Sequence, residues 1–298
     1  MTALLHDRIV VVGARGFIGA ALSRALSDKA EVLQLDLPEL DITDPESLSR
    51  SRASLSAFGR GGRCAVVNAA GLMDAALSRR EPDRFYRVNG LAVMDLWALA
   101  RDAGAGLFVH LSSETVFGSG DQPFEEHSPR VPLHPYGISK LLAELLLASM
   151  ARSGPPCMAL RLPVVVGRGQ VVGNPVSMFC EEAVRSGTIT IFNGGLHRRT
   201  FVHVDDVARA IIAVLSAPAP AAPVFHNIGG TTVSMREVAE AVAARLPGVR
   251  IVDKPSANQA FTLTSDARGF EARYGFRPQV DLDGLIGGFL EKSTRSNP

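Results

Sequence analysis

The chain has little of what would direct a protein to a membrane, a nucleic acid or an oxidising compartment. Its 298 residues include three cysteines and one tryptophan, and the formal net charge is +1. A charge so close to zero provides no long-range field for nucleic acid or an anionic membrane. The cysteines are odd in number and lie in apolar surroundings, so we expect packed, reduced thiols and a cytoplasmic protein.

Long hydrophobic runs are also absent. The most apolar stretch, Leu141 to Met150, contains Glu144 and is far shorter than the roughly 18 residues that a membrane span needs. A strand pattern begins within about seven residues of the N-terminus, which leaves no room for a secretory signal. We therefore expect neither a membrane segment nor a signal peptide. The 46% of hydrophobic residues are enough for a substantial core.

Short β-branched runs alternate with longer helical patterns through the first half of the chain. Strand patterns cover residues 8–12, 31–36, 64–68, 107–112 and 158–166, with helical patterns between them. The alternation is typical of βαβ units, and the nearly continuous apolar strands indicate burial on both faces. The sequence thus predicts an α/β fold with a doubly wound parallel Rossmann sheet.

After Gly167 the predicted elements become shorter, with glycine and proline between them. This change indicates a smaller, interleaved C-terminal α/β region that holds the substrate. We expect residues 1–166, with about 200–228, to form the dinucleotide-binding domain, and residues 167–199 and 229–298 to form the substrate-binding region. The Pro/Ala run at 217–223 is short, so we interpret it as a surface loop and not as an interdomain linker.

Three glycines follow the first predicted strand at intervals of three residues, at Gly13, Gly16 and Gly19. Gly13 permits a tight turn, Gly16 lets the backbone approach a pyrophosphate, and Gly19 allows close packing of the helix on the sheet. The N-terminus of that helix offers free N–H donors to phosphate. The spacing differs from the G-x-G-x-x-G fingerprint, so simple turn glycines remain an alternative for this motif alone.

Two side chains bear on the choice between NAD(H) and NADP(H). Asp36 ends the second strand, where a carboxylate accepts hydrogen bonds from the adenosine ribose and repels a 2′-phosphate, which favours NAD(H). Arg15 argues for NADP(H), because a guanidinium can pair with a 2′-phosphate, although a solvated loop arginine explains it equally well. Asp41 and Ile42 lie where the chain would return over the adenine, but Thr43 or Asp44 before Pro45 also indicates an ordinary helix N-cap, which needs no ligand.

A phenol and an ammonium stand four residues apart at Tyr136 and Lys140, hence on one face of a helix. A nearby lysine cation favours the phenolate, so we expect Lys140 to lower the pKa of Tyr136 from its usual value near 10. Ser113 follows the 107–112 strand at the sheet edge where ligands bind in open α/β folds. Its hydroxyl can hold a substrate oxygen opposite the phenol, so Ser113, Tyr136 and Lys140 are the predicted catalytic residues.

Taken together, these motifs resemble the extended short-chain dehydrogenase/reductase family, also described as the NAD-dependent epimerase/dehydratase family, and within it the enzymes of nucleotide-diphosphate sugars. The resemblance covers nearly the whole length and includes Gly13-x-x-Gly16-x-x-Gly19, Asn68-Ala-Ala-Gly71, Asn89, Ser112-Ser113 and Tyr136-x-x-x-Lys140. It implies that Ser113 is the catalytic hydroxyl, Tyr136 the acid–base and Lys140 a ligand of the nicotinamide ribose. It also implies cofactor contacts at Phe17, Ile18, Ala69, Ala70 and Gly71.

The resemblance extends to a stretch that ends in His203-Val-Asp-Asp, where Thr200 replaces the family's usual aspartate. It implies that Arg199 grips the substrate diphosphate, a role suited to a fork-shaped, permanently charged donor. Asn174 matches an asparagine that contacts the same group in relatives, although an asparagine before proline is also an ordinary turn residue. Glu114, beside Ser113, is a further predicted substrate contact.

No metal site is predicted. His203, Asp205 and Asp206 lie together, but at a strand-to-helix transition aspartates are ordinary N-caps. The other histidines lack paired ligand spacing, and the cysteines do not lie near them in the sequence.

The family's nucleotide-sugar dehydratases carry an Asp-Glu pair after the catalytic hydroxyl, where this chain has Glu114 and Thr115. We therefore expect 4-keto reduction, as in the dehydrorhamnose reductase group, although that group's usual Thr-Asp-Tyr is here Ser113-Glu114-Thr115. A 4-epimerase that retains NAD uses the same residues and stays open. A non-catalytic dinucleotide-binding regulatory subunit also stays open, and the intact Tyr136–Lys140 pair argues against it. The resemblance further implies a homodimer through the helices around 82–103 and 134–151.

Overall fold

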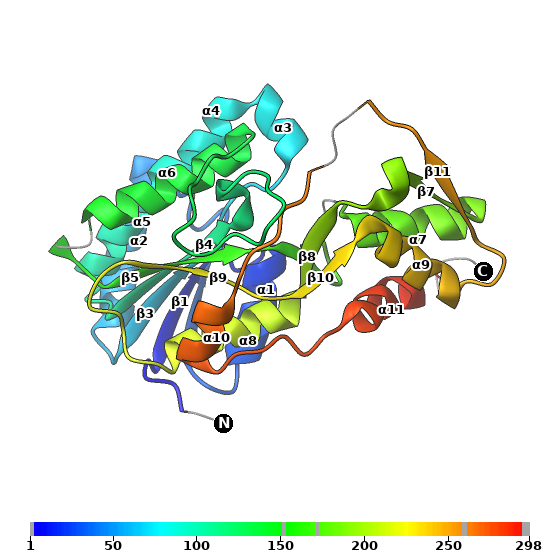
Figure 1. Cartoon of the computed structure of the whole chain (residues 1–298). Helices are drawn as coiled ribbons and strands as arrows, with labels where there is room; N and C mark the ends of the chain where they lie inside the picture. Colours follow the sequence, from blue (N-terminus) through cyan, green and yellow to red (C-terminus); the bar gives the residue numbers. More distant parts are fainter. Residues whose placement is uncertain (1–2, 151–152, 171–172, 258–260, 294–298) are drawn as a thin grey trace.

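The computed structural model describes residues 3–150, 153–170, 173–257 and 261–293. A six-stranded sheet organises one lobe of the molecule (Figure 1). Its strands are β1 (Arg8–Val12), β2 (Glu31–Leu35), β3 (Cys64–Asn68), β4 (Leu107–Ser113), β5 (Cys157–Leu162) and β9 (Val224–Asn227). Their spatial order is β2-β1-β3-β4-β5-β9, and every pair is parallel. The predicted doubly wound Rossmann sheet is confirmed.

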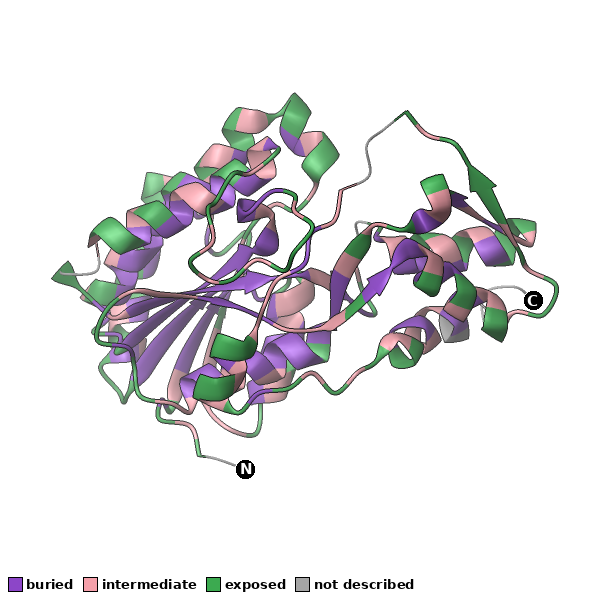
Figure 2. Ribbon diagram, in the orientation of Figure 1, coloured by how far each residue is buried: buried purple, intermediate pink, exposed green. Residues whose placement is uncertain are grey.

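Helices cover both faces of this sheet, and Figure 2 shows its central strands, β1, β3, β4 and β5, buried between them. One layer contains α1 (Phe17–Leu26), α8 (Val204–Leu215) and α10 (Arg268–Tyr274). The other contains α2 (Pro45–Gly59), α5 (Ala92–Asp102) and α6 (Pro135–Met150). All three cysteines are buried and unpaired, as predicted. Within the described residues, no helix has both the length and the apolar character to cross a membrane.

The topological switch point lies at β1, because β2 and β3 flank it on opposite sides. The chain passes from β1 to β2 on one side and then crosses back past β1 to β3 on the other, which opens a crevice at the carboxyl ends of β1 and β3, where open α/β sheets bind ligands. Gly13, just after β1, has a φ of +80°, and a Cβ there would lie 2.5 Å from the backbone nitrogen of Ala70. Only glycine fits this position, so the fold brings the glycine loop and residues 69–71 together.

One predicted strand, 158–166, is wrong in its extent. The structure divides it into β5 and β6 (Val164–Val166), because Pro163 lacks the N–H that would continue the ladder. β6 instead joins β8 (Arg198–His203) and β10 (Thr231–Ser234) in a second sheet of order β10-β8-β6.

The helical pattern at 82–103 is also interrupted. It contains α4 (Pro82–Phe85), a π-helical segment η1 (Tyr86–Leu91) and α5, and it follows the short helix α3 (Ala75–Arg80). Asn89, within η1, accepts a hydrogen bond from the Leu72 N–H at 2.8 Å and donates to the Leu72 carbonyl at 3.0 Å. The buried Asn89 amide thus fixes the chain that follows β3, a structural role that needs no ligand.

The second lobe is built on β7 (Thr188–Phe192), which pairs in parallel with β11 (Arg250–Lys254) (Figure 1). α7 (Pro175–Ser186), α9 (Met235–Arg245) and α11 (Leu282–Ser293) pack with it around a separate apolar cluster. Residues 217–223 form the predicted loop between α8 and β9. The division into two functional regions stays a prediction. β8 runs unbroken across the predicted boundary at 199/200. Phe270 of α10, which belongs to the predicted substrate-binding region, packs into the core of the large sheet.

A crossing segment, residues 261–266, links the two lobes. Leu263 donates its N–H to the Arg198 carbonyl at 3.1 Å, and Phe124 donates its N–H to the Thr264 carbonyl at 2.9 Å. The segment therefore lies between β8 and the loop that follows β4, with Leu263 and Thr264 buried.

Candidate active site

Ser113 ends β4 at the carboxyl edge of the large sheet. The strand stops there because the chain enters a 3₁₀ turn, η2 (Glu114–Val116), which Ser113 caps. Its Oγ accepts hydrogen bonds from the Thr115 N–H at 3.2 Å and from the Thr115 hydroxyl at 3.0 Å. The predicted catalytic hydroxyl is therefore held at a fixed place at this edge.

Tyr136 lies in the first turn of α6 and is half-buried. Its ring packs edge-on against Phe85, with centroids 6.3 Å apart, and nearly parallel to His134 at 5.9 Å. Burial raises the pKa of the phenol, while the Ser113 hydroxyl acts in the opposite direction and the Glu114 charge adds to the rise. The structure thus brings Ser113 and Tyr136 together, and the phenol stays protonated at neutral pH.

Lys140 is buried one helical turn further along α6, and its Nζ donates a hydrogen bond to the Leu111 carbonyl at 2.8 Å. A Cβ added at Gly71 would lie 3.2 Å from Nζ, so the ammonium reaches the end of β3 at the switch point. Burial lowers the pKa of Lys140 to about 8, although the nearby Glu144 charge raises it. The expected lowering of the Tyr136 pKa by Lys140 is wrong, because the ammonium binds a strand carbonyl and burial dominates the phenol.

A buried ion pair between Glu144 and Arg161 holds the helix that carries Tyr136 and Lys140 in place. Glu144, one turn after Lys140 on α6, accepts hydrogen bonds from Arg161 Nε at 2.9 Å and Nη2 at 2.8 Å. The Ser112 hydroxyl donates to the same carboxylate at 2.7 Å, and Arg130 donates at 3.3 Å. Glu144 and Arg161 are both fully buried. The pair therefore ties α6, which carries Tyr136, to the carboxyl ends of β4 and β5.

A second pair of acidic and basic side chains lies beside Ser113, and its contact is incomplete. Glu114 Oε1 is 3.6 Å from Arg199 Nη2, too far for a hydrogen bond. Both Glu114 oxygens, Arg199 Nε and the Ser265 hydroxyl are buried without a hydrogen-bond partner in the described part of the chain. Burial raises the pKa of Glu114 to about 8, although Arg199 and Ser265 act in the opposite direction. Such orphaned polar atoms at a sheet edge are typical of a ligand site.

The raised pKa of Glu114 predicts a pH-dependent stability. The folded state holds this proton up to about pH 8, whereas the unfolded carboxyl releases it near 4.5. The free energy of unfolding should therefore fall as pH rises through this window, by up to about 1.4 kcal/mol per pH unit from this one group. Urea denaturation of Glu114→Gln should show a flatter pH dependence than wild type, and Glu46→Gln on exposed α2 should not. Parallel curves for wild type and Glu114→Gln would contradict the assignment.

The glycine loop fits a pyrophosphate. α1 begins at Phe17 with Gly16 as its N-cap, and no side chain caps it. Phe17, Ile18 and Gly19 form its first turn, so the predicted phosphate-binding N–H groups lie at an uncapped helix N-terminus beside the switch point. Ala69 and Ala70 are half-buried at the end of β3, and Gly71 is exposed next to them.

The residues predicted to contact the adenosine have local partners. Asp36 Oδ2 accepts the Arg15 N–H at 2.7 Å, and Oδ1 accepts the Leu37 N–H at 2.8 Å. Asp41 accepts the N–H and hydroxyl of Thr43, which lowers its pKa. Ile42 packs in the core under α2. These contacts give Asp41 and Ile42 structural roles, and their contact with adenine stays a prediction.

Asn174 and His203 act as helix caps. The Asn174 carboxamide oxygen accepts the Val176 and Ser177 N–H groups at the start of α7. Its Nδ2 donates to Gln170, so both ends of the carboxamide have partners close in the sequence, and contact with a substrate diphosphate stays a prediction.

At α8 the structure corrects one interpretation, because the N-cap is His203 and not an aspartate. Asp206 is buried and instead accepts the N–H groups of Gln279 and Val280. No group of three or more potential metal-ligating side chains occurs in the parts of the chain described above.

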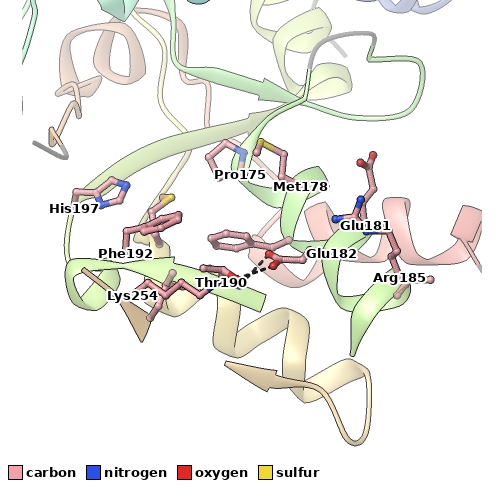
Figure 3. Close-up of a pocket in the computed structure, with 13 residues that line it drawn as sticks. Pro175, Met178, Glu181, Glu182, Arg185, Thr190, Phe192, His197 and Lys254 are labelled. Atoms are coloured by element: carbon pink, nitrogen blue, oxygen red, sulfur yellow. Dashed lines mark hydrogen bonds between the residues drawn. The ribbon is translucent and has the colours of Figure 1, made fainter. Parts of the chain in front are cut away.

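A pocket of about 870 Å³ opens in the second lobe between α7, β7 and the end of β11 (Figure 3). Phe192, Met178 and Pro175 give it apolar walls, and His197 lies at its side near β8. Glu182 is fixed there by the N–H and hydroxyl of Thr190. None of the predicted catalytic residues lines this pocket, but Pro175 follows Asn174 and His197 precedes Arg199 by two residues.

Arg161, Ser265 and Glu144 belong to the site although none of them is a predicted site residue. Glu144 carried a signal, since it continues the four-residue spacing of Tyr136 and Lys140 for another turn. Arg161 is one charge within an otherwise apolar strand, which indicates a buried partner. For Ser265 no local signal exists, because the crossing segment reaches the site only through long-range pairing.

The Rossmann switch point, its glycine loop and the Ser113–Tyr136 pair define a dinucleotide-dependent oxidoreductase of the short-chain dehydrogenase/reductase class. Residues 9–229 match the model of the NAD dependent epimerase/dehydratase family. The chain belongs to this family and is an NAD-dependent enzyme.

Individual relatives agree with this assignment. The dTDP-glucose 4,6-dehydratase of Streptomyces niveus is 28% identical, over 94% of this chain and 90% of its own length. The dTDP-4-dehydrorhamnose reductase of Burkholderia thailandensis is 37% identical, over 47% of this chain and 45% of its own. The solved structure of MoeE5 in complex with UDP-glucose and NAD superposes with a TM-score of 0.82 at 28% identity, and covers 98% of this chain and 100% of that one.

Proposed function

We propose that the protein reduces a 4-keto group of a nucleotide-diphosphate sugar, with Tyr136 as the proton donor. The observation that carries the proposal is that the Ser113 hydroxyl and the Tyr136 phenol lie close enough to influence each other, at the carboxyl edge of the sheet that carries the glycine loop. When bound, NADH supplies the hydride for such a reduction. Ser113 would hold the carbonyl oxygen, and the protonated phenol would give that oxygen its proton.

Dehydration fits the site less well. An elimination needs an ionised base as well as an acid, and the position after Glu114 holds Thr115, whose hydroxyl is bonded to Ser113. Burial raises the pKa of Glu114 to about 8, so at neutral pH its carboxyl is mostly protonated and is not the standing carboxylate that such a base requires. A reduction requires no such base.

The neutral state of Glu114 also bears on the substrate. Because a protonated carboxyl does not cancel the Arg199 charge, the guanidinium is available for an anion, and its Nε has no partner in the described residues. We propose that Arg199 binds the substrate diphosphate. The pocket beyond His197 would then hold the nucleoside, with Phe192 as a flat, half-exposed apolar surface for the base (Figure 3).

The proposed reaction is tested with purified protein, NADH and a panel of dTDP- and UDP-linked 4-keto sugars. We expect stoichiometric loss of the reduced-nicotinamide absorbance with at least one of them. NAD that stays bound through purification, with interconversion of C4 epimers and no net redox change, would replace the proposal with a 4-epimerase. Dinucleotide binding without turnover across the panel would replace it with a regulatory subunit.

A homodimer is part of the proposal. Leu91 of η1 and Ile138 and Leu145 of α6 are exposed large apolar side chains on two segments that pack together. Exposed apolar groups on adjoining helices favour pairing with a second copy. The mass of the protein in solution tests this.

A further inference from the structure

The one cation of the glycine loop, Arg15, is already held by an acidic partner. Its Nη1 donates to Glu39 Oε2 at 2.8 Å and its Nη2 donates to Glu39 Oε1 at 2.7 Å, the paired geometry in which a guanidinium also binds a phosphate. Nη1 contacts the Leu37 carbonyl as well. The donors that a 2′-phosphate would use are therefore engaged by the protein itself.

A second carboxylate adjoins this pair. Asp36 accepts the backbone N–H of Arg15 at 2.7 Å, so the guanidinium residue lies between two acidic side chains. The three groups together carry one net negative charge at the end of β2, where the adenosine ribose is expected. A ribose 2′-hydroxyl needs only an acceptor here, whereas a 2′-phosphate must displace Glu39 from Arg15 and also meet Asp36.

We infer that Glu39 is a cofactor-selectivity residue, which acts as an internal competitor of the 2′-phosphate for Arg15 and so keeps the enzyme selective for NAD(H). The inference rests on the proposed placement of the dinucleotide at the glycine loop. The Arg15 side chain is 59% exposed and that of Glu39 50%. Exposed pairs of this kind add little to folding stability, so Glu39 can be changed without loss of the fold.

The test compares NADH and NADPH binding, followed by cofactor fluorescence, in wild type, Glu39→Gln, Arg15→Ala and the double variant. Glutamine keeps the shape of Glu39 and removes its charge. We expect Glu39→Gln to increase NADPH affinity by about 3- to 5-fold, the range over which an exposed ion pair can compete for the guanidinium, with NADH affinity changed by less than about twofold. The NADPH gain should shrink at high salt and should be absent when Arg15 is alanine.

Glu31→Gln is the matched control. Glu31 is similarly exposed and pairs with Arg8 at the opposite end of β2, so its removal should leave the NADH-to-NADPH ratio unchanged. Two results would overturn the inference: equal effects of Glu39→Gln on both dinucleotides, or a gain in NADPH affinity that persists without Arg15. Neither result would affect the placement of the dinucleotide, as long as the wild type binds NADH. Failure of wild type to bind NADH would overturn the placement of the dinucleotide, and the inference with it.

Discussion

Replacement of Tyr136 by phenylalanine should lower turnover by about 10²-fold or more, because the phenol supplies the proton in the transition state. NADH affinity should stay within about twofold of wild type, since the ring and its packing against Phe85 and His134 are kept. Steady-state kinetics with the active keto sugar and fluorescence titration with NADH measure the two effects separately.

Tyr274→Phe is the control for this variant. It removes the same hydroxyl from a ring at α10, where the phenol contacts Arg273 and Met158, remote in the fold from Ser113. Its turnover should match wild type. If Tyr136→Phe also turned over normally, another group would have to be the proton donor. Because burial raises the Tyr136 pKa, reduction by wild type should not be lost by phenol ionisation anywhere in the neutral range.

Replacement of Glu144 by alanine should destabilise the fold by about 3–5 kcal/mol, the usual cost of leaving one member of a buried ion pair without its partner. Arg161 would keep its charge in a site that is 1% exposed, with only the Glu126 carbonyl and the faces of Phe117 and Phe225 around it. Chemical denaturation followed by far-ultraviolet circular dichroism measures the loss.

A paired variant separates charge from packing. Glu144→Leu together with Arg161→Met removes both charges and keeps apolar volume, so it should be more stable than Glu144→Ala alone. If the double variant were the less stable of the two, the loss would reflect shape at this position and not an uncompensated guanidinium.

The parts of the fold that the sequence predicted are those that depend on local pattern. Burial on both faces leaves a continuous apolar run, and the limits of β1 and β3 match the predicted strands at 8–12 and 64–68. The hydrophobic pattern predicted the wrong extent for an element where a single residue interrupts it. Pro163 sends β6 into another sheet, and the Asn89 amide accompanies a π-helical turn inside an otherwise regular helical pattern.

In the candidate site, too, the residues set by local pattern were predicted and those set by tertiary contacts were not. A four-residue spacing placed Tyr136 and Lys140 on one helix, and the strand end placed Ser113, but which atoms they reach depends on tertiary contacts. Lys140 binds the Leu111 carbonyl, which no spacing indicates. Arg161 and Glu144 meet from β5 and α6, and Ser265 arrives from the end of the chain, so their roles follow from topology alone.

The position of β9 has a consequence for synthesis of the protein. β9 pairs with β5 and completes the large sheet, yet it is made more than 60 residues after that strand ends (Leu162 to Val224). Until then, a growing chain on the ribosome presents β5 as an unpaired edge of six residues that are all buried in the finished fold. Such an edge is a template for association with another chain. In this interval the nascent protein therefore carries a strand edge that can associate with other chains until β9 covers it.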